Sequence, residues 1–338
     1  MDKSFEEFEK IILNKKYETT EKMKLLAGDA SSRLYWRWSC SPQDTKIICV
    51  YPEKDDLTAS SFQRFINWQK FYIENGFNVP KIHYVDEKIQ LMVMDDLGKN
   101  SLLEYLTNQS EELELEMMKK AIDQIIKLGQ FQIDKKEFVH LPKFNLEKLQ
   151  FEIGHTITYF YQNYLEVNNH DILNEMRSEW ALFLDPLTHG PWKLSHRDFH
   201  SRNIMIKRDT LGLIDFQDTM LGLEVYDLCS LLDDCYRRVT PAVYHQCLVY
   251  YWDQVSLVKK STHFSSFYEF MYFYQRMKIQ RQFKAIGSFA YVWKKRNNPR
   301  YLKYISYVME SIKTSFATMS GKETKKLERL LFENYYAN

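Results

Sequence analysis

The sequence predicts an α+β protein with two lobes, a small mixed lobe built on a β-sheet at residues 1–96 and a mostly helical lobe at residues 97–338. Short runs rich in β-branched and aromatic residues, separated by turn residues, predict strands in the first part. From residue 101 onward, apolar residues recur mainly at helical spacing. The chain has 338 residues, which is long enough for two lobes with a large buried core.

The first lobe is predicted to contain five strands and one long helix, preceded by a short helix at residues 4–14 that begins with a Ser-x-x-Glu capping box. The strands are expected at residues 22–26, 34–39, 45–51, 81–85 and 89–94, and the long helix at residues 60–75. Gly76 is expected to end that helix. The sequence Asp-Asp-Leu-Gly at residues 95–98 then breaks the pattern and predicts the boundary between the lobes.

The second lobe is predicted to be helical apart from one hairpin. Helices are expected at residues 102–106, 113–131, 146–164, 172–183, 225–236, 242–253, 267–288, 300–315 and 323–334. The hairpin has strands at residues 204–207 and 212–214, joined by a polar turn at 208–211. Because a hairpin brings its two ends together, Asn203 and Asp215 are expected to face one space, with Asp198 on the adjoining loop within reach of it.

Charge and cysteine content narrow the function classes. Forty-six Lys and Arg against forty-five Asp and Glu give a formal net charge of +1, so we expect no nucleic-acid partner and no attraction to membranes. The first residues do not resemble a signal peptide, and no apolar run is long enough to cross a membrane. Five cysteines without a C-x-x-C motif favour reduced, packed thiols over disulfides. We therefore expect a cytoplasmic protein, and a monomer.

The segment 196–203, His-Arg-Asp-Phe-His-Ser-Arg-Asn, carries the chemistry. Asp198 stands two residues after a His, Asn203 five residues further on, and Asp215 twelve after that. This spacing is typical of phosphoryl transfer, which needs a carboxylate to take the acceptor's proton and oxygen ligands to hold Mg²⁺ against a triphosphate. Asp198 is predicted as the base, and Asn203 and Asp215 as the metal ligands. Arg202 is predicted as a second catalytic residue that neutralises charge on the transferred group, with a structural ion pair as the other interpretation.

Other interpretations of this segment are weaker. Asp and Asn in a loop often bond only to their own backbone, but the hairpin and Asp215 in register favour catalysis. His196 and His200 are four residues apart, yet the loop setting and the lack of a Cys pair or an H-E-x-x-H motif argue against zinc. His196 is expected to be structural, and Asp227 to be a helix cap or an internal anchor.

Four blocks of sequence resemble the kinase-like phosphotransferases of small molecules, the aminoglycoside and choline kinase group. These blocks are residues 28–33, 195–203, 214–218 with Gly222 and 226–228, and 280–287. The first and last look like one branch, the anomeric kinases of N-acetylmuramate and N-acetylglucosamine in the recycling of bacterial peptidoglycan. The resemblance implies a protein-kinase-like fold with ATP in the cleft between the lobes. It also implies Mg²⁺-dependent transfer to the anomeric hydroxyl of an N-acetylated amino sugar.

Two departures from the kinase pattern concern the phosphates of ATP. The third strand lacks the interior Lys that kinases pair with a Glu. Three residues are candidates to replace it: Arg33, which we prefer, Arg37 and Lys46. The phosphate loop keeps only Gly28 of the usual glycines, so Ser31 and Ser32 are expected to donate to phosphate oxygens. A plain hairpin turn is the other interpretation of this loop, and the family resemblance favours the phosphate role.

Contacts to adenine and to the acceptor follow from position. Backbone groups of Met94 and Asp95, near the lobe boundary, are expected to meet the adenine edge. Acceptor binding is predicted for two carboxylates after the metal strand and two cations on a late helix: Asp218, Glu224, Arg281 and Lys284. The carboxylate of a muramic sugar would favour a nearby Arg, although a solvated basic helix face is the other interpretation of that helix.

Two alternative functions remain at this stage. The same scaffold could serve another alcohol, such as an aminoglycoside or choline. A pseudokinase that only binds nucleotide is suggested by the missing Lys, but intact Asp198, Asn203 and Asp215 count against it.

Overall fold

The structure is a computed structural model, and it describes residues 23–26, 33–41, 44–51, 56–131, 141–319 and 322–337. The chain divides into two compact units, Met1–Lys99 with Met205–Gln217, and Asn100–Ile204 with Asp218–Asn338. The first unit thus includes a later segment, 205–217, that the sequence analysis assigned to the second lobe. The helix predicted at residues 4–14 lies outside the described residues.

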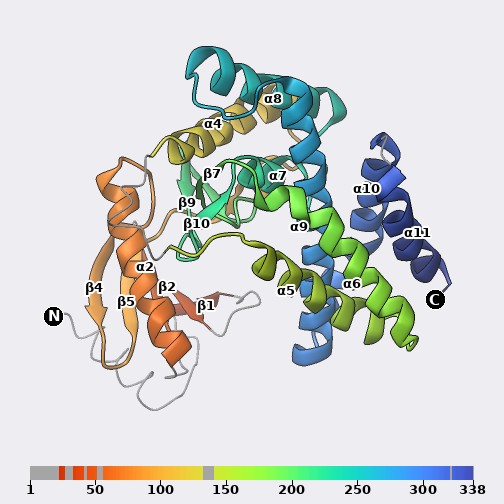
Figure 1. Cartoon of the computed structure of the whole chain (residues 1–338). Helices are drawn as coiled ribbons and strands as arrows, with labels where there is room; N and C mark the ends of the chain where they lie inside the picture. Colours follow the sequence, from red (N-terminus) through yellow and green to blue (C-terminus); the bar gives the residue numbers. More distant parts are fainter. Residues whose placement is uncertain are drawn as a thin grey trace. The chain divides into compact units, whose positions relative to one another are not determined.

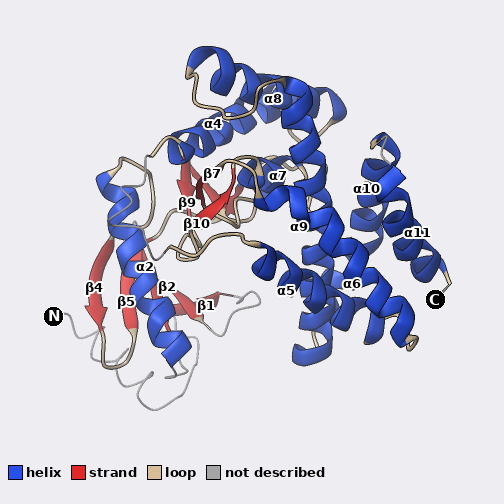
Figure 2. Ribbon diagram, viewed as in Figure 1, coloured by secondary structure: helices blue, strands red, loops and turns tan. Residues whose placement is uncertain are grey.

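A five-stranded antiparallel sheet of order β1-β2-β3-β5-β4 forms the centre of the first unit (Figure 2). Its strands are β1 Met23–Leu26, β2 Leu34–Ser41, β3 Asp44–Val50, β4 Ile82–Asp86 and β5 Leu91–Asp95, close to the predicted bounds. Trp36 pairs with Ile48, which in turn pairs with Val93, and all three are buried in one cluster. The alternation of side chains along the strands therefore builds the core of this unit.

Helix α2, Asp56–Glu74, fixes the segment that carries Asp215. Its buried side chains include Phe65 and Tyr72, and the ring of Phe216 packs against both, with centroids 4.7 and 5.3 Å apart. Gly76, with φ of 69°, follows the helix as the sequence predicts.

The hairpin of strands β8, Ile204–Lys207, and β9, Thr210–Leu213, precedes Asp215. The turn residues Arg208 and Asp209 both have positive φ, 50° and 58°, as a two-residue turn between antiparallel strands requires. The second strand accordingly begins at residue 210, two residues earlier than predicted.

The second unit is mostly helical (Figure 1). Its helices are α3 Leu102–Tyr105, α4 Glu111–Gly129, α5 Leu146–Thr156, α6 His170–Leu184, α7 Tyr226–Leu232, α8 Pro241–Asp253, α9 Phe267–Arg296, α10 Ile305–Thr318 and α11 Lys322–Tyr336. The π-helical segments η1 Ile157–Gln162 and η3 Gln254–Val258 extend α5 and α8, and the 3₁₀ segments η2 Asp185–Thr188 and η4 Pro299–Tyr304 follow α6 and α9. The short strands are β6 Asn100–Ser101, β7 Trp192–Ser195 and β10 Met220–Leu223, and β7 pairs with β10 in antiparallel fashion.

Helix α9 is the longest helix of the second unit, and α5, η1, α7 and α10 pack against it. It runs to Arg296, eight residues beyond the prediction, and ends at Asn297 in the left-handed conformation with φ of 50°. Gly287 allows α5 to approach closely, because a Cβ at this position would lie 2.6 Å from the Cα of Thr156. The Thr156 hydroxyl also donates to the carbonyl of Phe283, at 3.1 Å.

Two elements differ from the sequence analysis for local reasons. Helix α7 ends at Leu232 instead of residue 236, and the acidic pair Asp233 and Asp234 leaves the helix there to serve as hydrogen-bond acceptors. Strand β10 was not predicted, because its four residues are all buried and show neither the strand nor the helix period.

All five cysteines are free, four of them buried, as the sequence analysis predicted for packed thiols, whereas Cys40 is exposed. Within the part of the chain that the structure describes, no helix has the length and apolar character needed to span a bilayer.

Candidate active site

Two buried carboxylates hold the loop between β7 and β8. Asp227, in the first turn of α7, accepts the backbone N–H groups of His196 at 2.6 Å and Arg197 at 2.9 Å. Asp234 accepts both the N–H, at 2.9 Å, and the hydroxyl, at 2.5 Å, of Ser201. The predicted role of Asp227 as an internal anchor is confirmed, and Asp234 is a second anchor.

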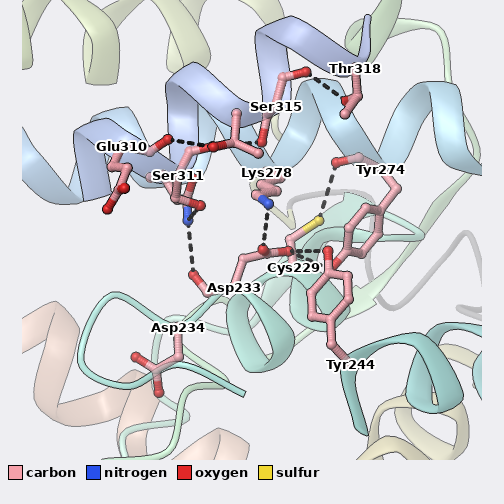
Figure 3. A network of polar contacts seen from close by, with 12 residues as sticks. Cys229, Asp233, Asp234, Tyr244, Tyr274, Lys278, Glu310, Ser311, Ser315 and Thr318 are labelled. Atoms are coloured by element: carbon pink, nitrogen blue, oxygen red, sulfur yellow. Dashed lines mark hydrogen bonds and ion pairs between the residues drawn. The ribbon is translucent and has the colours of Figure 1, made fainter. Parts of the chain in front are cut away.

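The corner that carries Asp234 is itself fixed by the packed helices. Figure 3 shows the neighbouring Asp233, whose carboxylate accepts the hydroxyls of Tyr274 at 2.5 Å and Tyr244 at 3.2 Å. The same carboxylate pairs with Lys278 of α9 at 2.8 Å. Side chains from α8 and α9 therefore fix the position of Asp233 and, with it, that of the neighbouring anchor Asp234.

Asp198 is fixed through its backbone and not through its carboxylate. Its carbonyl accepts the side-chain N–H of Asn203 and the backbone N–H of His200, both at 3.0 Å. From the residues that the structure describes, no hydrogen bond reaches its carboxylate. The preceding residue, Arg197, has φ of 80°, a conformation that residues with side chains rarely adopt, and the N–H bond to Asp227 supports it.

The charge of Asp198 is stabilised by its surroundings. Burial alone would raise the pKa of this carboxyl, but the cations of Lys284, Arg197, His200 and Arg281 hold the pKa well below its usual range. The carboxylate is therefore ionised at neutral pH and open to a further hydrogen-bond donor.

A second carboxylate, Glu152 of α5, organises the cations next to this loop. It is buried, accepts the side-chain N–H of Gln280 at 3.0 Å, and lies 3.3 Å from Arg197, 3.6 Å from Lys284 and 4.0 Å from Lys148. Burial alone would raise the pKa of Glu152, but these three cations lower it. The four charged side chains Glu152, Lys148, Arg197 and Lys284 are called the Glu152 cluster below.

Sequence reasoning missed Glu152, although a signal was present. The residue lies on the buried stripe of α5 together with Leu149, Ile153 and Thr156. An acidic residue at such a position is costly unless it is paired, so its presence there indicates a buried partner.

The predicted acceptor residues fall into two places. Arg281 is only 7% exposed, and both Arg281 and Lys284 lie close enough to Asp198 to lower its pKa. The alternative of a solvated basic face is therefore wrong for these two residues. Asp218 acts electrostatically on Lys148 in the same region.

Glu224 stands apart from that group. Its carboxylate lies 3.3 Å from the ring of His263 and 4.0 Å from Lys193 of β7. The second unit thus brings Asp198, Asp218, Arg281 and Lys284 into one charged region without Glu224.

Arg202 is packed against aromatic rings. Its guanidinium lies 4.8 Å from the ring centroid of Tyr236 and 5.7 Å from that of Tyr301, and it donates to the Tyr301 hydroxyl at 3.4 Å. Such stacking between a guanidinium and aromatic rings holds the arginine in place. Its catalytic assignment stays a prediction.

In the first unit, Asp215 is held by direct hydrogen bonds. Its carboxylate accepts Nη2 of Arg33 at 2.8 Å and Nε2 of Gln217 at 2.9 Å, and its φ is 65°. The carboxylate predicted as a metal ligand is thus paired with an arginine, and its assignment as a metal ligand stays a prediction.

The other two candidate cations are engaged elsewhere in the first unit. Arg37 donates twice to the Asp96 carboxylate, at 2.6 and 3.0 Å, and to the Gly98 carbonyl. Lys46 pairs with Asp95 at 3.0 Å. Of the three candidates, Arg33 is the one that contacts Asp215.

The structure describes only some of the residues that were predicted to bind the nucleotide. Gly28, Ser31 and Ser32 lie outside the described residues. Met94 is buried in β5, and the N–H of Asp95 donates to the Lys81 carbonyl at 3.0 Å.

The proposed metal ligands suit magnesium in their chemistry. Asn203 offers an amide oxygen and Asp215 a carboxylate, and Mg²⁺ prefers such hard oxygen donors. Over the described ranges, no group of three or more His, Cys, Asp or Glu side chains could hold a metal ion.

In sequence and fold, the chain is similar to known phosphotransferases. Residues 22–256 match the model of the phosphotransferase enzyme family. The N-acetylmuramate/N-acetylglucosamine kinase of Neisseria meningitidis serogroup B is 27% identical over 294 residues, covering 83% of this chain and 84% of that protein. The protein of the same name from Pseudomonas aeruginosa is 25% identical over 300 residues, covering 86% and 82%.

Solved structures of similar fold include an ADP-bound aminoglycoside phosphotransferase, APH(2'')-Ib, with a TM-score of 0.61 and 17% identity over 91% of this chain and 97% of that one. Another is an amicoumacin kinase in complex with AMP-PNP and Ca²⁺, with a TM-score of 0.60 and 13% identity over 94% and 97%. These likenesses confirm the predicted two-lobed, kinase-like α+β fold.

Proposed function

We propose that this chain uses ATP to phosphorylate the anomeric hydroxyl of an N-acetylated amino sugar. The chain belongs to the phosphotransferase enzyme family and is therefore a kinase that phosphorylates a hydroxyl group. N-acetylmuramate and N-acetylglucosamine are the acceptors we propose, because relatives at 23–27% identity carry these sugars in their names. The sequence blocks at residues 28–33 and 280–287 support the same branch.

The observation that carries the proposal is the open, ionised carboxylate of Asp198. A carboxylate that no described residue bonds can accept a hydrogen bond from an acceptor hydroxyl and orient that oxygen toward the γ-phosphoryl group. Its low pKa makes it a weak base, which suits an anomeric hydroxyl because a hemiacetal is more acidic than an ordinary alcohol. Catalysis would then rest mainly on positioning and charge compensation.

Asn203 and Asp215 would hold Mg²⁺, which supplies charge compensation on the β- and γ-phosphates when it is bound. Arg33 would supply the cation that kinases take from a third-strand Lys. This assignment rests on its contact with Asp215, and on the engagement of Arg37 and Lys46 with other carboxylates. Gly28, Ser31 and Ser32 would line the phosphates, and Met94 and Asp95 the adenine.

Phosphorus NMR after incubation with ATP, Mg²⁺ and a panel of acceptors tests the proposal. We expect a sugar 1-phosphate from an N-acetylated amino sugar and no product from choline or an aminoglycoside. A product from one of those alcohols instead would move the enzyme to another acceptor class. The absence of any product, with nucleotide bound, would indicate a pseudokinase.

The setting of the reaction belongs to the same proposal. We propose that the enzyme acts as a monomer in the cytoplasm, on sugars released during peptidoglycan recycling. Sedimentation of the purified protein tests the oligomeric state, and loss of sugar 1-phosphate from cells that lack the gene tests the pathway.

A further inference from the structure

We propose that the Glu152 cluster binds an anionic substituent of the acceptor through Lys148, so that the enzyme prefers an acidic amino sugar to its neutral counterpart. This inference rests on the proposed function, and it names the side chain that distinguishes N-acetylmuramate, which carries a carboxylate on its lactyl ether, from N-acetylglucosamine, which does not.

Lys148 pairs with Glu152 only at the outer limit of an ion pair. Its nearest carboxylate oxygen, on Glu152, is 4.0 Å away, and its Nζ makes no hydrogen bond to any residue in the described ranges. The side chain is 34% exposed, so one side faces solvent while the other lies against the cluster. A lysine in this situation is open to an acceptor from outside the chain.

The neighbours of Lys148 make an anion favourable at this place. Arg197 and Lys284 lie 3.3 and 3.6 Å from Oε1 of Glu152, the oxygen that Lys148 also approaches. Burial, together with repulsion from Arg197 and Lys284, lowers the pKa of Lys148. Glu152 and Asp218 offset part of this repulsion. A bound carboxylate would relieve it further, because three cations face one oxygen of Glu152.

A second donor in the cluster is also unused. The buried Nε of Arg197 has no hydrogen-bond partner among the described residues. Arg197 directly precedes Asp198, so an anion bound by the cluster would belong to the molecule whose hydroxyl Asp198 receives. Glu152 keeps these cations in position beforehand, which lowers the cost of binding.

Apolar surface adjoins the cation. Phe151 is 67% exposed, and the Lys148 Nζ lies 5.5 Å from the centroid of its ring. A carboxylate attached to a small apolar group matches this pair, because the charge meets the ammonium while the carbon atoms meet the ring. The lactyl group, a carboxylate beside a methyl group, has this composition.

Calorimetric titration of each sugar into the full chain without nucleotide tests the inference. We expect the unchanged protein to bind N-acetylmuramate about 10- to 100-fold more tightly than N-acetylglucosamine, as a charge-assisted hydrogen bond provides. Lys148→Gln should abolish this preference by weakening only N-acetylmuramate, whereas Lys148→Arg should retain most of it. Added salt should reduce the preference of the unchanged protein.

The matched control is Lys120→Gln, which removes a partly exposed lysine of α4 that pairs with Glu116 at 2.7 Å. It should leave the binding of both sugars as it is. Thermal unfolding of each variant shows that the fold is kept.

Two results would overturn the inference. The unchanged protein binds the two sugars equally, or Lys148→Gln weakens both sugars to the same extent, as expected if the cluster serves the transferred phosphoryl group or the fold. Failure of the proposed function would give a different result, because neither sugar would then be phosphorylated. The binding measurement would still decide whether Lys148 recognises a carboxylate.

Discussion

The two units hold their key carboxylates in opposite ways. In the first unit, the Asp215 carboxylate accepts direct hydrogen bonds from Arg33 and Gln217, at 2.8 and 2.9 Å. In the second unit, Asp198 has a fixed backbone, but its carboxylate is bonded by no described residue and is stabilised by the charges of Lys284, Arg197, His200 and Arg281.

This difference corresponds to two kinds of chemical task. A metal ligand needs a fixed orientation and must tolerate an adjacent cation. Direct hydrogen bonds fix the orientation, and a bond from an arginine shows that an adjacent cation is tolerated. A base has to stay ionised while leaving its lone pairs available, and only charges at longer range achieve that. The predictions below test whether Asp198 and Asp215 are divided in this way.

The largest effect is expected from Asp198→Asn. An amide at this position cannot take the acceptor's proton, so kcat should fall about 10²- to 10⁴-fold. The affinity for MgADP, measured by calorimetry, should stay the same, whereas Asp215→Asn should weaken it strongly. If Asp198→Asn lost MgADP affinity and kept its kcat, the two roles would have to be exchanged.

Glu152→Gln tests the long-range part of the comparison. The substitution keeps the shape of the side chain but leaves Arg197, Lys284 and Lys148 without their shared anion. Breaking a buried ion pair in this way should cost about 3–5 kcal/mol of the free energy of unfolding, measured with urea at neutral pH.

The control for that measurement is an exposed pair in the same unit. Glu310 bonds Arg238 at 2.9 Å, but both side chains face solvent. Glu310→Gln should therefore cost no more than about 1 kcal/mol. Equal losses in Glu152→Gln and Glu310→Gln would mean that the cluster does not depend on its buried anion.

What the sequence could predict follows the same division between local and distant interactions. The loop spacing of Asp198 and Asn203 and the hairpin leading to Asp215 could be predicted, because each depends on residues close together in the chain. The strands of the first unit were found for the same reason, since alternation is a local signal. Asp227 was predicted as a helix cap or an internal anchor, but its partners His196 and Arg197, about thirty residues away, are known only from the structure.

The surroundings of Asp198 could not be read in this way. Glu152, Lys148 and Lys284 come from α5 and α9, more than a hundred residues apart, and only the packing of these helices brings them together. Asp234 appeared to lie inside a helix, because nothing in the local pattern shows that α7 ends at Leu232. Tertiary contacts decided these positions, and a single sequence does not show them.

The third prediction concerns pH and the anchor Asp227. Burial raises the pKa of this carboxyl to about 7, outweighing the bonds from His196 and Arg197. In the unfolded chain its pKa is near 4, so between these values the folded state binds more protons and stability falls as pH rises. This group should remove about 2–3 kcal/mol of the free energy of unfolding between pH 5 and pH 8.

Urea unfolding at the two pH values checks this prediction, with Asp227→Asn as the comparison. Because the asparagine does not titrate, the variant should lose this part of the decrease in unfolding free energy with pH. Asp198 and Glu152 do not interfere. Their pKa values are lowered, so their contribution is present above pH 4 and is lost only in more acidic solution. An unchanged slope in Asp227→Asn would show that the anchor is ionised throughout this range.

The smallest effects concern the distance between α5 and α9, on which the field around Asp198 depends. A Cβ at Gly287 would meet Thr156, so Gly287→Ala should force the helices apart and cost about 1–3 kcal/mol of stability. Gly154, also in α5, has nothing within 4 Å of an added Cβ, and Gly154→Ala should instead gain about 0.5–1 kcal/mol.

If α5 moves, Glu152 moves away from Lys284, and Gly287→Ala should also lower kcat while Gly154→Ala leaves it unchanged. Loss of stability in Gly287→Ala with full kcat would show that the field tolerates such a shift, and that Asp198 relies less on the Glu152 cluster than the comparison with Asp215 implies.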